Sequence, residues 1–181
     1  MAPTLTNTKI SNIGFKMMAT FGIPIRNLFM PPKLMFDEVE IKPGYHVLDF
    51  GCGPATFTKM MAEKIGNSGK LYALDIHPFA IKTVKKLAEK NKLSNVNTIL
   101  SNCDTSISPE SLDLVIIFDV FHILNNQNDV IKEIHRVLKR NGIMSFSDHH
   151  MKEEEILKKL SENGLFKLVK KGKMTFDFVK V

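Results

Sequence analysis

The chain has 181 residues, of which 44% are hydrophobic and 24% charged, as in an ordinary globular protein. This length predicts one α/β domain with a full core and is too short for two comfortable ones. No apolar run approaches the roughly 20 residues that cross a bilayer, and no basic segment followed by an apolar one resembles a secretion signal. These patterns argue against membrane-spanning and secreted proteins, so we expect a cytoplasmic protein.

The net charge is +6, and lysines are frequent in residues 151–181. We interpret them as a solvated surface, although a basic tail also suits nucleic acid or an acidic partner protein. The two cysteines, Cys52 and Cys103, lack the spacing of a metal site and indicate reduced, packed thiols. The sequence therefore predicts no metal, and it does not indicate an oligomeric state.

Residues 47–58, VLDFGCGPATFT, form the stretch around which the domain is organised. An apolar strand runs to Phe50, a Gly-x-Gly turn follows, and helical spacing of apolar residues predicts a helix over 54–66. Glycines let a backbone approach a ligand closely, and the helix N-terminus offers free N–H groups. Taken alone, the Gly-x-Gly pattern also fits a tight turn that binds no ligand. Asp49 favours a cationic or hydroxyl-rich ligand over a pyrophosphate.

The segment before this stretch divides into two parts. Residues 1–8 are polar, whereas residues 9–30 are too apolar for a disordered tail and predict one or two short helices. These helices form either a lid over a substrate pocket or additional core packing. Pro31 and Pro32 then open a helix that runs to about Ile41. We therefore expect an N-terminal segment of residues 1–30 and one domain over 31–181.

Strands and helices alternate through the rest of the chain. Parallel strands are predicted at 45–50, 70–75, 96–100, 112–118 and 143–147, and helices from Pro78, over 127–139 and over 152–163. Asn141-Gly142 is expected to end the second of these helices in a left-handed turn. The last strands, 165–170 and 174–180, are too close in sequence for a crossover helix and must pair antiparallel. The prediction is a Rossmann-like, doubly wound α/β sheet with five parallel strands, a C-terminal antiparallel hairpin and helices on both faces.

Carboxylates follow the first three strands of this predicted sheet, at the edge where open α/β sheets bind ligands. Asp49 stands near the end of the first, Asp75 ends the second, and Asp104 follows the third. Asp75 can accept hydrogen bonds from both hydroxyls of a ribose, and Asp104 can accept one from an exocyclic amine. Any one of these acids could be a helix cap. Together they predict a site for a phosphate-free, cationic nucleoside.

Five motifs stand in the order and spacing of a known family: VLDFGCGPATFT, LYALDIHP, SNCD, LDLVIIFDVFHIL and HRVLKRNGIMSF. Over about residues 32–180 the chain resembles class I S-adenosylmethionine-dependent methyltransferases. Within them it is most similar to small-molecule enzymes of the menaquinone/ubiquinone-biosynthesis type. Arg140-Asn141-Gly142 replaces the usual Pro-Gly-Gly turn. Phe118–Phe121 differs from the Asn/Asp-Pro-Pro-Tyr motif of amino-directed DNA and RNA methylases, which argues against base methylation.

The resemblance implies S-adenosylmethionine as the cofactor and assigns roles by position. The glycines of the turn would pack under its methionine part, Asp75 would bind the ribose, and Cys103 with Asp104 would frame the adenine. Phe118 and Asp119 would line the wall beside the sulfonium. The full set of cofactor-binding residues is Asp49, Gly51, Cys52, Gly53, Asp75, Ile76, Cys103, Asp104, Phe118 and Asp119.

Methyl transfer from a sulfonium is an in-line displacement, so the protein mainly aligns the acceptor and excludes water. A base is needed only where the acceptor loses a proton. His122, Asp148, His149 and His150 are candidate bases, but each also fits a cap or a packed histidine, and the sequence assigns no catalytic residue. We expect Asp148-His149-His150 not to bind one metal ion, because neighbours on an extended chain point to opposite faces.

The acceptor site must come from the stretch before Pro31 and the loops after the fourth and fifth strands. Its lining would be apolar and aromatic, which suits a small-molecule acceptor and at most weak, non-productive RNA binding: Ile13, Phe15, Met17, Met18, Phe21, Phe29, Phe121, His122 and His149. A protein or RNA acceptor and a non-catalytic cofactor-binding subunit are the alternatives. Asp75 would also suit the ribose of NAD in an oxidoreductase, but Thr56 occupies the third glycine position of the Gly-x-Gly-x-x-Gly fingerprint of such enzymes.

Overall fold

The computed structural model describes residues 11–22, 25, 31–162 and 164–181. Phe29 and the side chains of Met18 and Phe21, which we expected near the acceptor, lie outside the described part of the chain.

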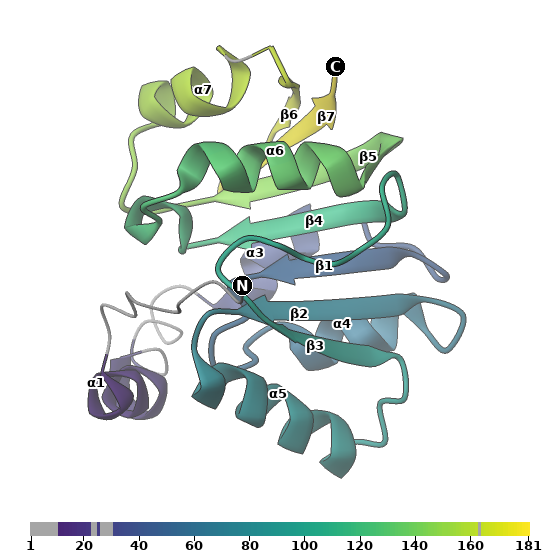
Figure 1. Cartoon of the computed structure of the whole chain (residues 1–181), viewed down its shortest axis with the longest axis vertical. Coiled ribbons are helices and arrows are strands. Elements are labelled where there is room, and N and C mark those ends of the chain that lie inside the picture. Colours follow the sequence, from purple (N-terminus) through teal and green to yellow (C-terminus); the bar gives the residue numbers. More distant parts are fainter. Residues whose placement is uncertain (1–10, 23–24, 26–30, 163) are drawn as a thin grey trace, which may run out of the picture.

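The described residues form a seven-stranded sheet in the order β3-β2-β1-β4-β5-β7-β6 (Figure 1). β1 to β5 pair in parallel, whereas β7 runs antiparallel to both β5 and β6. This confirms the predicted sheet and hairpin. The strands are β1 His46–Phe50, β2 Lys70–Asp75, β3 Val96–Leu100, β4 Leu112–Phe118, β5 Leu138–Ser147, β6 Phe166–Lys171 and β7 Phe176–Lys180.

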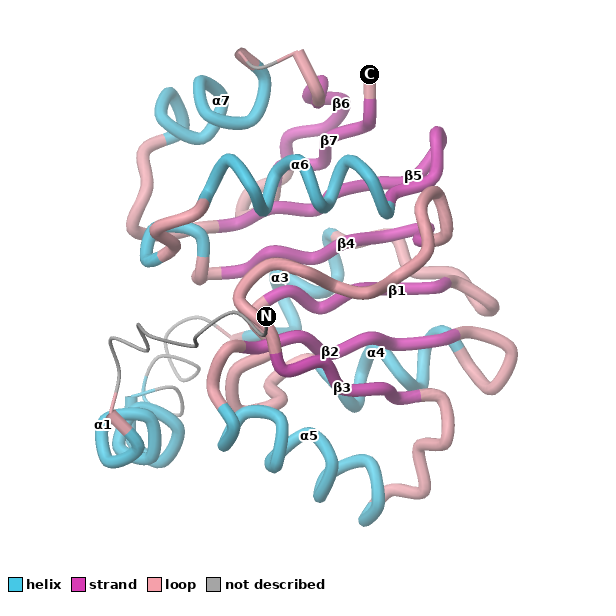
Figure 2. The backbone as a smooth tube through the Cα atoms, viewed as in Figure 1, coloured by secondary structure: helices cyan, strands magenta, loops and turns pink. Residues whose placement is uncertain are grey.

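Helices cover both faces of the sheet (Figures 1 and 2). Val47 of β1 packs in one layer with α3 and α4, and Ala73 of β2 packs against α5 on the same face, whereas Leu48 and Phe50 belong to a layer with α6 and α7. The helical elements are α1 Asn12–Met17, π-helix η1 Met18–Gly22, α3 Pro32–Glu38, α4 Thr58–Ile65, α5 Pro78–Lys90, 3-10 helix η2 Phe121–Ile123, α6 Gln127–Val137 and α7 Glu153–Ser161. Among the described helices, none is long and apolar enough to cross a membrane.

The strand order reverses between β1 and β4, because β2 and β3 extend the sheet on one side of β1 and β4 and β5 on the other. In open α/β sheets the carboxyl edge at this reversal is where ligands bind. We therefore expect a ligand site among the residues that follow β1, β2 and β4.

Two predicted boundaries differ from the structure. The helix after the glycine turn begins at Thr58 rather than Pro54, because Ala55 takes φ +68°, which a helix does not accommodate. β5 begins directly after α6, at Leu138, so Gly142 lies inside a strand and not in a left-handed turn. A glycine is needed there for another reason, since a Cβ would lie 2.9 Å from the carbonyl oxygen of Leu112.

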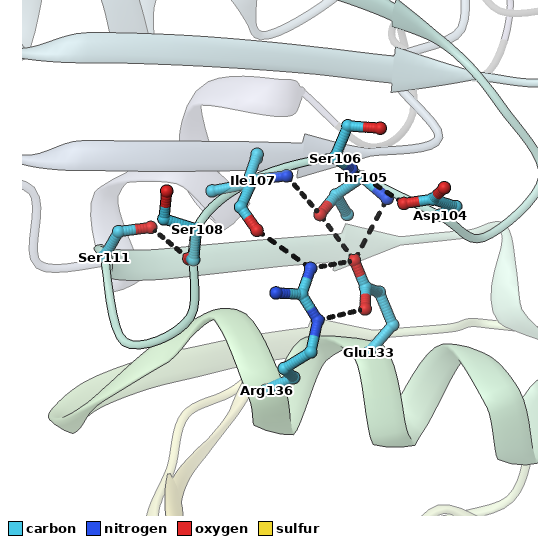
Figure 3. Close-up of polar contacts among 8 residues, drawn as sticks. All are labelled: Asp104, Thr105, Ser106, Ile107, Ser108, Ser111, Glu133 and Arg136. Carbon is cyan, nitrogen blue, oxygen red and sulfur yellow. Dashed lines mark hydrogen bonds and ion pairs between the residues drawn. The ribbon is translucent and has the colours of Figure 1, made fainter.

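The chain passes from β3 to β4 through a loop, residues 101–111, that α6 holds in place (Figure 3). The backbone N–H of Thr105 donates to Glu133 at 3.0 Å, and Arg136 donates both to Glu133 at 2.7 Å and to the carbonyl of Ile107 at 2.8 Å. The Ile107 side chain is buried in the layer that contains α6. Partial burial alone would raise the pKa of Glu133, but the Arg136 and Thr105 hydrogen bonds hold it below its usual value. The loop is therefore anchored on an ionised carboxylate.

A second carboxylate ties the terminal hairpin to α3. Glu38 accepts hydrogen bonds from the backbone N–H groups of Lys173, Met174 and Thr175 at 3.0–3.1 Å. A Cβ on Gly172 would overlap the Glu38 carboxylate, so a side chain at this position would require that carboxylate to move. Partial burial alone would raise the pKa of Glu38, but the hydrogen bonds from these donors outweigh it and hold the pKa below its ordinary value.

We expect Glu38→Gln to lower the free energy of unfolding by about 1 kcal/mol at pH 7, allowing for solvent screening of a partly exposed group. Because the folded pKa is depressed, this stabilisation is present above the unfolded pKa and is lost as the pH falls through the folded pKa. The difference between the two proteins in urea unfolding should therefore vanish in acid. Glu40→Gln, whose partner is the exposed Lys42, is the control and should change little. Equal effects of the two substitutions would contradict the anchoring role.

Candidate active site

The glycine turn after β1 packs against the segment that follows β4. Gly51 has φ +83° and Gly53 φ +51°, both in the left-handed region that favours glycine. The N–H groups of Gly51 and Cys52 donate to the carbonyl of Leu74 at 2.8 and 3.0 Å, which holds the turn beside the end of β2. A Cβ on Gly51 would lie 2.8 Å from a methyl carbon of Val120. Position 51 therefore has no room for a side chain. The sequence carries no signal that Val120 would be the residue in contact.

Asp49 is a buried carboxylate with unmet hydrogen-bonding capacity. Its side chain is buried, and its Oδ2 has no hydrogen-bond partner among the described residues. Burial, with a smaller contribution from the charge of Asp75, raises the pKa of Asp49 to about 7. An orphaned buried carboxylate oxygen is unfavourable unless a donor or a cation reaches it.

Asp75 links the end of β2 to the glycine turn. Its Oδ2 accepts from the N–H of Gly53 at 2.9 Å, and its Oδ1 accepts from the N–H of His77 at 2.8 Å. Burial raises the pKa of Asp75, while these two hydrogen bonds oppose the rise. Each carboxylate oxygen has a second lone pair with which to accept from a ligand hydroxyl. Ile76, next in the chain, is half-buried at the same edge.

Cys103 and Asp104 lie next to this site along the sheet edge. The N–H of Ser101 donates to the carbonyl of Asp75 at 3.1 Å, so the loop after β3 starts beside the end of β2. Cys103 and Asp104 line an open depression of about 520 Å³ together with residues of α6. Asp104 accepts from the N–H of Ser106 at 2.8 Å, and burial raises the pKa of the Cys103 thiol to about 11. This thiol is therefore a protonated packing group.

The described part of the N-terminal segment packs beside the glycine turn. Phe15 of α1 is buried and stacks on His77, with ring centroids 4.3 Å apart. It shares a hydrophobic cluster with Cys52, whose thiol pKa is raised by burial. Ile13 and Met17, which we expected to line the acceptor site, are largely exposed.

The predicted residues after β4 separate into core and edge. Phe118 is mostly buried and meets Phe57 edge-to-face at 5.5 Å. Phe121 is fully buried against Phe146, so the expectation that it lines the acceptor site is wrong. Its place in the 3-10 helix turns it into the core. Asp119 takes φ +53° and accepts from the N–H and the Nδ1 of His149 at 3.1 and 2.7 Å.

Three histidines gather at the ends of β4 and β5. The N–H and Nδ1 of His122 donate to Oδ2 of Asp148 at 3.0 and 2.9 Å, and the N–H of His150 donates to its Oδ1 at 3.1 Å. The His149 and His150 rings lie 3.9 Å apart. The argument that neighbours point to opposite faces applies to an extended chain, whereas here the chain turns after Asp148 and brings the rings together. In the part of the chain described, no group of three ligands is arranged to hold a metal ion.

The structure thus joins the glycine turn to Asp75 by a hydrogen bond and places Asp49 within reach of the charge of Asp75, with Asp119 and Val120 on the β4 side and Cys103 on the β3 side. An acidic, buried corner beside a tight glycine turn fits a cationic ligand that carries vicinal hydroxyls. That is the class of ligand that the strand-end carboxylates predicted.

Comparison with known proteins relates this chain to methyltransferases. Residues 41–175 match a family model described as a methyltransferase domain. The chain is 27% identical over 140 residues to the ubiquinone/menaquinone biosynthesis C-methyltransferase of Hydrogenovibrio crunogenus, covering 76% of this chain and 55% of that protein. It is 26% identical over 117 residues to the (S)-coclaurine N-methyltransferase of Thalictrum flavum subsp. glaucum, covering 65% and 32%. The chain therefore spans about half the length, or less, of these relatives.

A solved structure shows the same fold. The S-adenosylmethionine-dependent methyltransferase from Aquifex aeolicus superposes with a TM-score of 0.71 at 21% identity, covering 83% of this chain and 88% of that one. The matched domain includes every strand from β1 to β6 and the glycine turn. With most of its length under that family model and the predicted sheet of five parallel strands and a terminal hairpin in place, the chain belongs to the class I S-adenosylmethionine-dependent methyltransferases.

Proposed function

We propose that this chain binds S-adenosylmethionine at the carboxyl edge of β1 and β2 and transfers its methyl group to a small-molecule acceptor by in-line displacement. The observation that carries the proposal is the orphaned, buried carboxylate of Asp49 beside Asp75 under a glycine cradle. S-adenosylmethionine supplies a methyl group already activated on a sulfonium centre. The chain's own residues bind, orient and exclude water.

Each predicted site residue has a proposed role. Gly51 and Gly53 support the methionine part, with Cys52 packed beneath, and Asp49 balances its positive charge. Asp75 accepts from the ribose hydroxyls. The remaining residues frame the ends of the ligand: Ile76, Cys103 and Asp104 the adenine, and Phe118 and Asp119 the wall beside the sulfonium.

A small-molecule acceptor is the finer part of this proposal. The two curated relatives are named for methylation in ubiquinone/menaquinone biosynthesis and of coclaurine, and both are similar at low identity. A tritiated-methyl assay on a cytoplasmic extract, split into metabolite, protein and RNA fractions, addresses the acceptor class. Label chiefly in RNA or in protein would reject a small-molecule acceptor. A cytoplasmic location is part of the same proposal.

We further propose that residues 1–30 act as a packing segment or lid on a cofactor domain of residues 31–181. The stack of Phe15 on His77 supports this division, because it places α1 over the residue that follows Ile76. His77 also caps α5 by accepting from the N–H of Phe79 at 3.2 Å.

Thermal unfolding with added ligand tests cofactor binding. At a concentration 100 times its dissociation constant, S-adenosylmethionine should stabilise the protein by about 2.7 kcal/mol, whereas NAD should not. Asp75→Ala should fold but lose most of the shift, because each lost hydrogen bond to a carboxylate is worth about 1.5–3 kcal/mol. Stabilisation by NAD and not by S-adenosylmethionine would reject the proposal in favour of an oxidoreductase. Binding without methyl transfer to any fraction would indicate a non-catalytic subunit.

A further inference from the structure

The proposed cofactor site leaves one cluster of ionisable side chains unused. The rings of His122, His149 and His150, the histidine trio, lie in contact at the ends of β4 and β5, with His150 tilted by 42° against each of the other two. Its ring centroid lies 4.2 Å from that of His122 and 3.9 Å from that of His149. The described contacts place two carboxylates against the trio, those of Asp119 and Asp148.

These carboxylates determine which nitrogen of each outer ring carries the proton. The Asp148 side chain is fully buried and accepts from Nδ1 of His122 at 2.9 Å. Asp119 accepts from Nδ1 of His149 at 2.7 Å. A carboxylate only accepts, so Nδ1 of both rings must be the donor. The neutral ring of each therefore carries its basic lone pair on Nε2.

The trio also lies close to the proposed methyl donor site. Val120, two residues before His122, packs on the Gly51 cradle. Asp119, immediately before Val120, is held by His149. The segment 119–122 thus leads from the glycine turn to His122 within two residues.

From this arrangement we infer that His122 is the catalytic base, and that the acceptor is a small molecule whose nucleophilic atom carries an ionisable proton, such as a phenolic or enolic hydroxyl. The inference rests on the proposed function and names its substrate class. As the acceptor oxygen bonds to the methyl carbon, the carbon–sulfur bond breaks and its electron pair stays on sulfur. The O–H electron pair stays on oxygen, and the proton moves to Nε2 of His122. The products are a methyl ether, a neutral thioether and an imidazolium.

The rest of the cluster serves this proton. Asp148 is a positioning residue that orients His122 and stabilises the imidazolium. His150 and His149 are the exposed members and lead from His122 to solvent, where the proton is released.

The tautomers can be tested without cofactor or acceptor. In ¹⁵N NMR spectra of the full chain near pH 8, His122 and His149 should be Nδ1–H tautomers. His77 is the internal control, because its Nδ1 accepts from Phe79 N–H at 3.2 Å and its proton must be on Nε2. Asp148→Asn should reduce the share of the Nδ1–H tautomer at His122 and leave the tautomer of His77 unchanged. An Nε2–H tautomer at His122 would overturn the inference even in an active methyltransferase.

The second test measures the transfer of tritiated methyl groups to the metabolite fraction of the extract. His122→Gln should reduce kcat/KM at pH 7 at least 100-fold, abolish the acid limb of the pH profile, and recover at least tenfold with added imidazole. His135→Gln, on α6, is the control and should stay within twofold of the wild type. A His122→Gln enzyme within threefold of the wild type, or one that is impaired but not rescued by imidazole, would overturn the inference. Absence of methyl transfer by the wild type would instead reject the proposed function, and the inference with it.

Discussion

Replacing Asp49 by asparagine is expected to stabilise the ligand-free protein at pH 8 and to abolish S-adenosylmethionine binding. Burial and the neighbouring Asp75 raise the pKa of Asp49 from 3.8 to about 7. Each pKa unit corresponds to about 1.4 kcal/mol, so an ionised Asp49 opposes folding by up to about 4 kcal/mol. Asparagine has no charge to desolvate, and we expect a gain of roughly 2–4 kcal/mol in the free energy of unfolding.

The pH dependence of this effect has a defined sign. Because the folded pKa of Asp49 is raised, its contribution to stability is complete below pH 3.8 and is lost as the pH rises through about 7. The melting temperature of the wild type should therefore fall between pH 4 and 8 relative to that of Asp49→Asn. Near pH 6.5, binding of the cation should ionise Asp49 and release a fraction of a proton, which calorimetry in buffers of different ionisation enthalpy measures.

Asp177→Asn is the matched control, because Asp177 is also a buried aspartate with an oxygen that lacks a partner among the described residues, but lies on β7. It should leave cofactor binding unchanged. An Asp49→Asn protein that binds S-adenosylmethionine as tightly as the wild type would remove Asp49 from the site.

The second large effect is expected at the cradle, where Gly51→Ala should lower the free energy of unfolding by about 2–4 kcal/mol. A left-handed alanine contributes about 1–2 kcal/mol of strain, and overpacking against Val120 adds about 1–3 kcal/mol. Because the turn must shift to relieve the clash with Val120, the proposed cofactor site should be distorted and binding should weaken. Urea unfolding and titration calorimetry measure the two effects separately.

Two further variants separate strain from crowding. Gly164 has φ +71° and open space around its Cβ position, so Gly164→Ala should show the strain of about 1–2 kcal/mol alone. Val120→Ala makes room at position 51, and the double variant Gly51→Ala/Val120→Ala should recover part of the stability that Gly51→Ala loses. Additive effects of the two substitutions would show that the Val120 contact does not limit position 51.

Much of the fold could be predicted from the sequence because its signals are local. Apolar runs such as 112–118 specify buried parallel strands, and the short connection between β6 and β7 leaves room only for antiparallel pairing. The strand-end acids could be found for the same reason, since all parallel strands end at one edge of the sheet. The chain order of strands and acids therefore predicted the ligand class before any distance was known.

Where the sequence failed, the deciding contact came from another part of the chain. Ala55 has no local signal for a left-handed backbone, yet that conformation delays the helix to Thr58. Phe121 reads as an aromatic edge residue, but the 3-10 helix turns it onto Phe146. On an extended strand the side chains of His149 and His150 would point to opposite faces, but the turn after Asp148 brings their ring centroids to 3.9 Å from each other.

The sequence by itself determined the positions of the strands, the hairpin and the acids at the strand ends, because these follow from periodicity and connection length. Only the tertiary structure decided the chemistry of those acids. Asp49 acquires its raised pKa from burial beside Asp75, 26 positions later in the chain, and Gly51 becomes a cradle only because Val120 packs on it. His122 obtains its tautomer from Asp148. Desolvation, steric contact and proton position depend on distances through space, and spacing along the chain does not specify them.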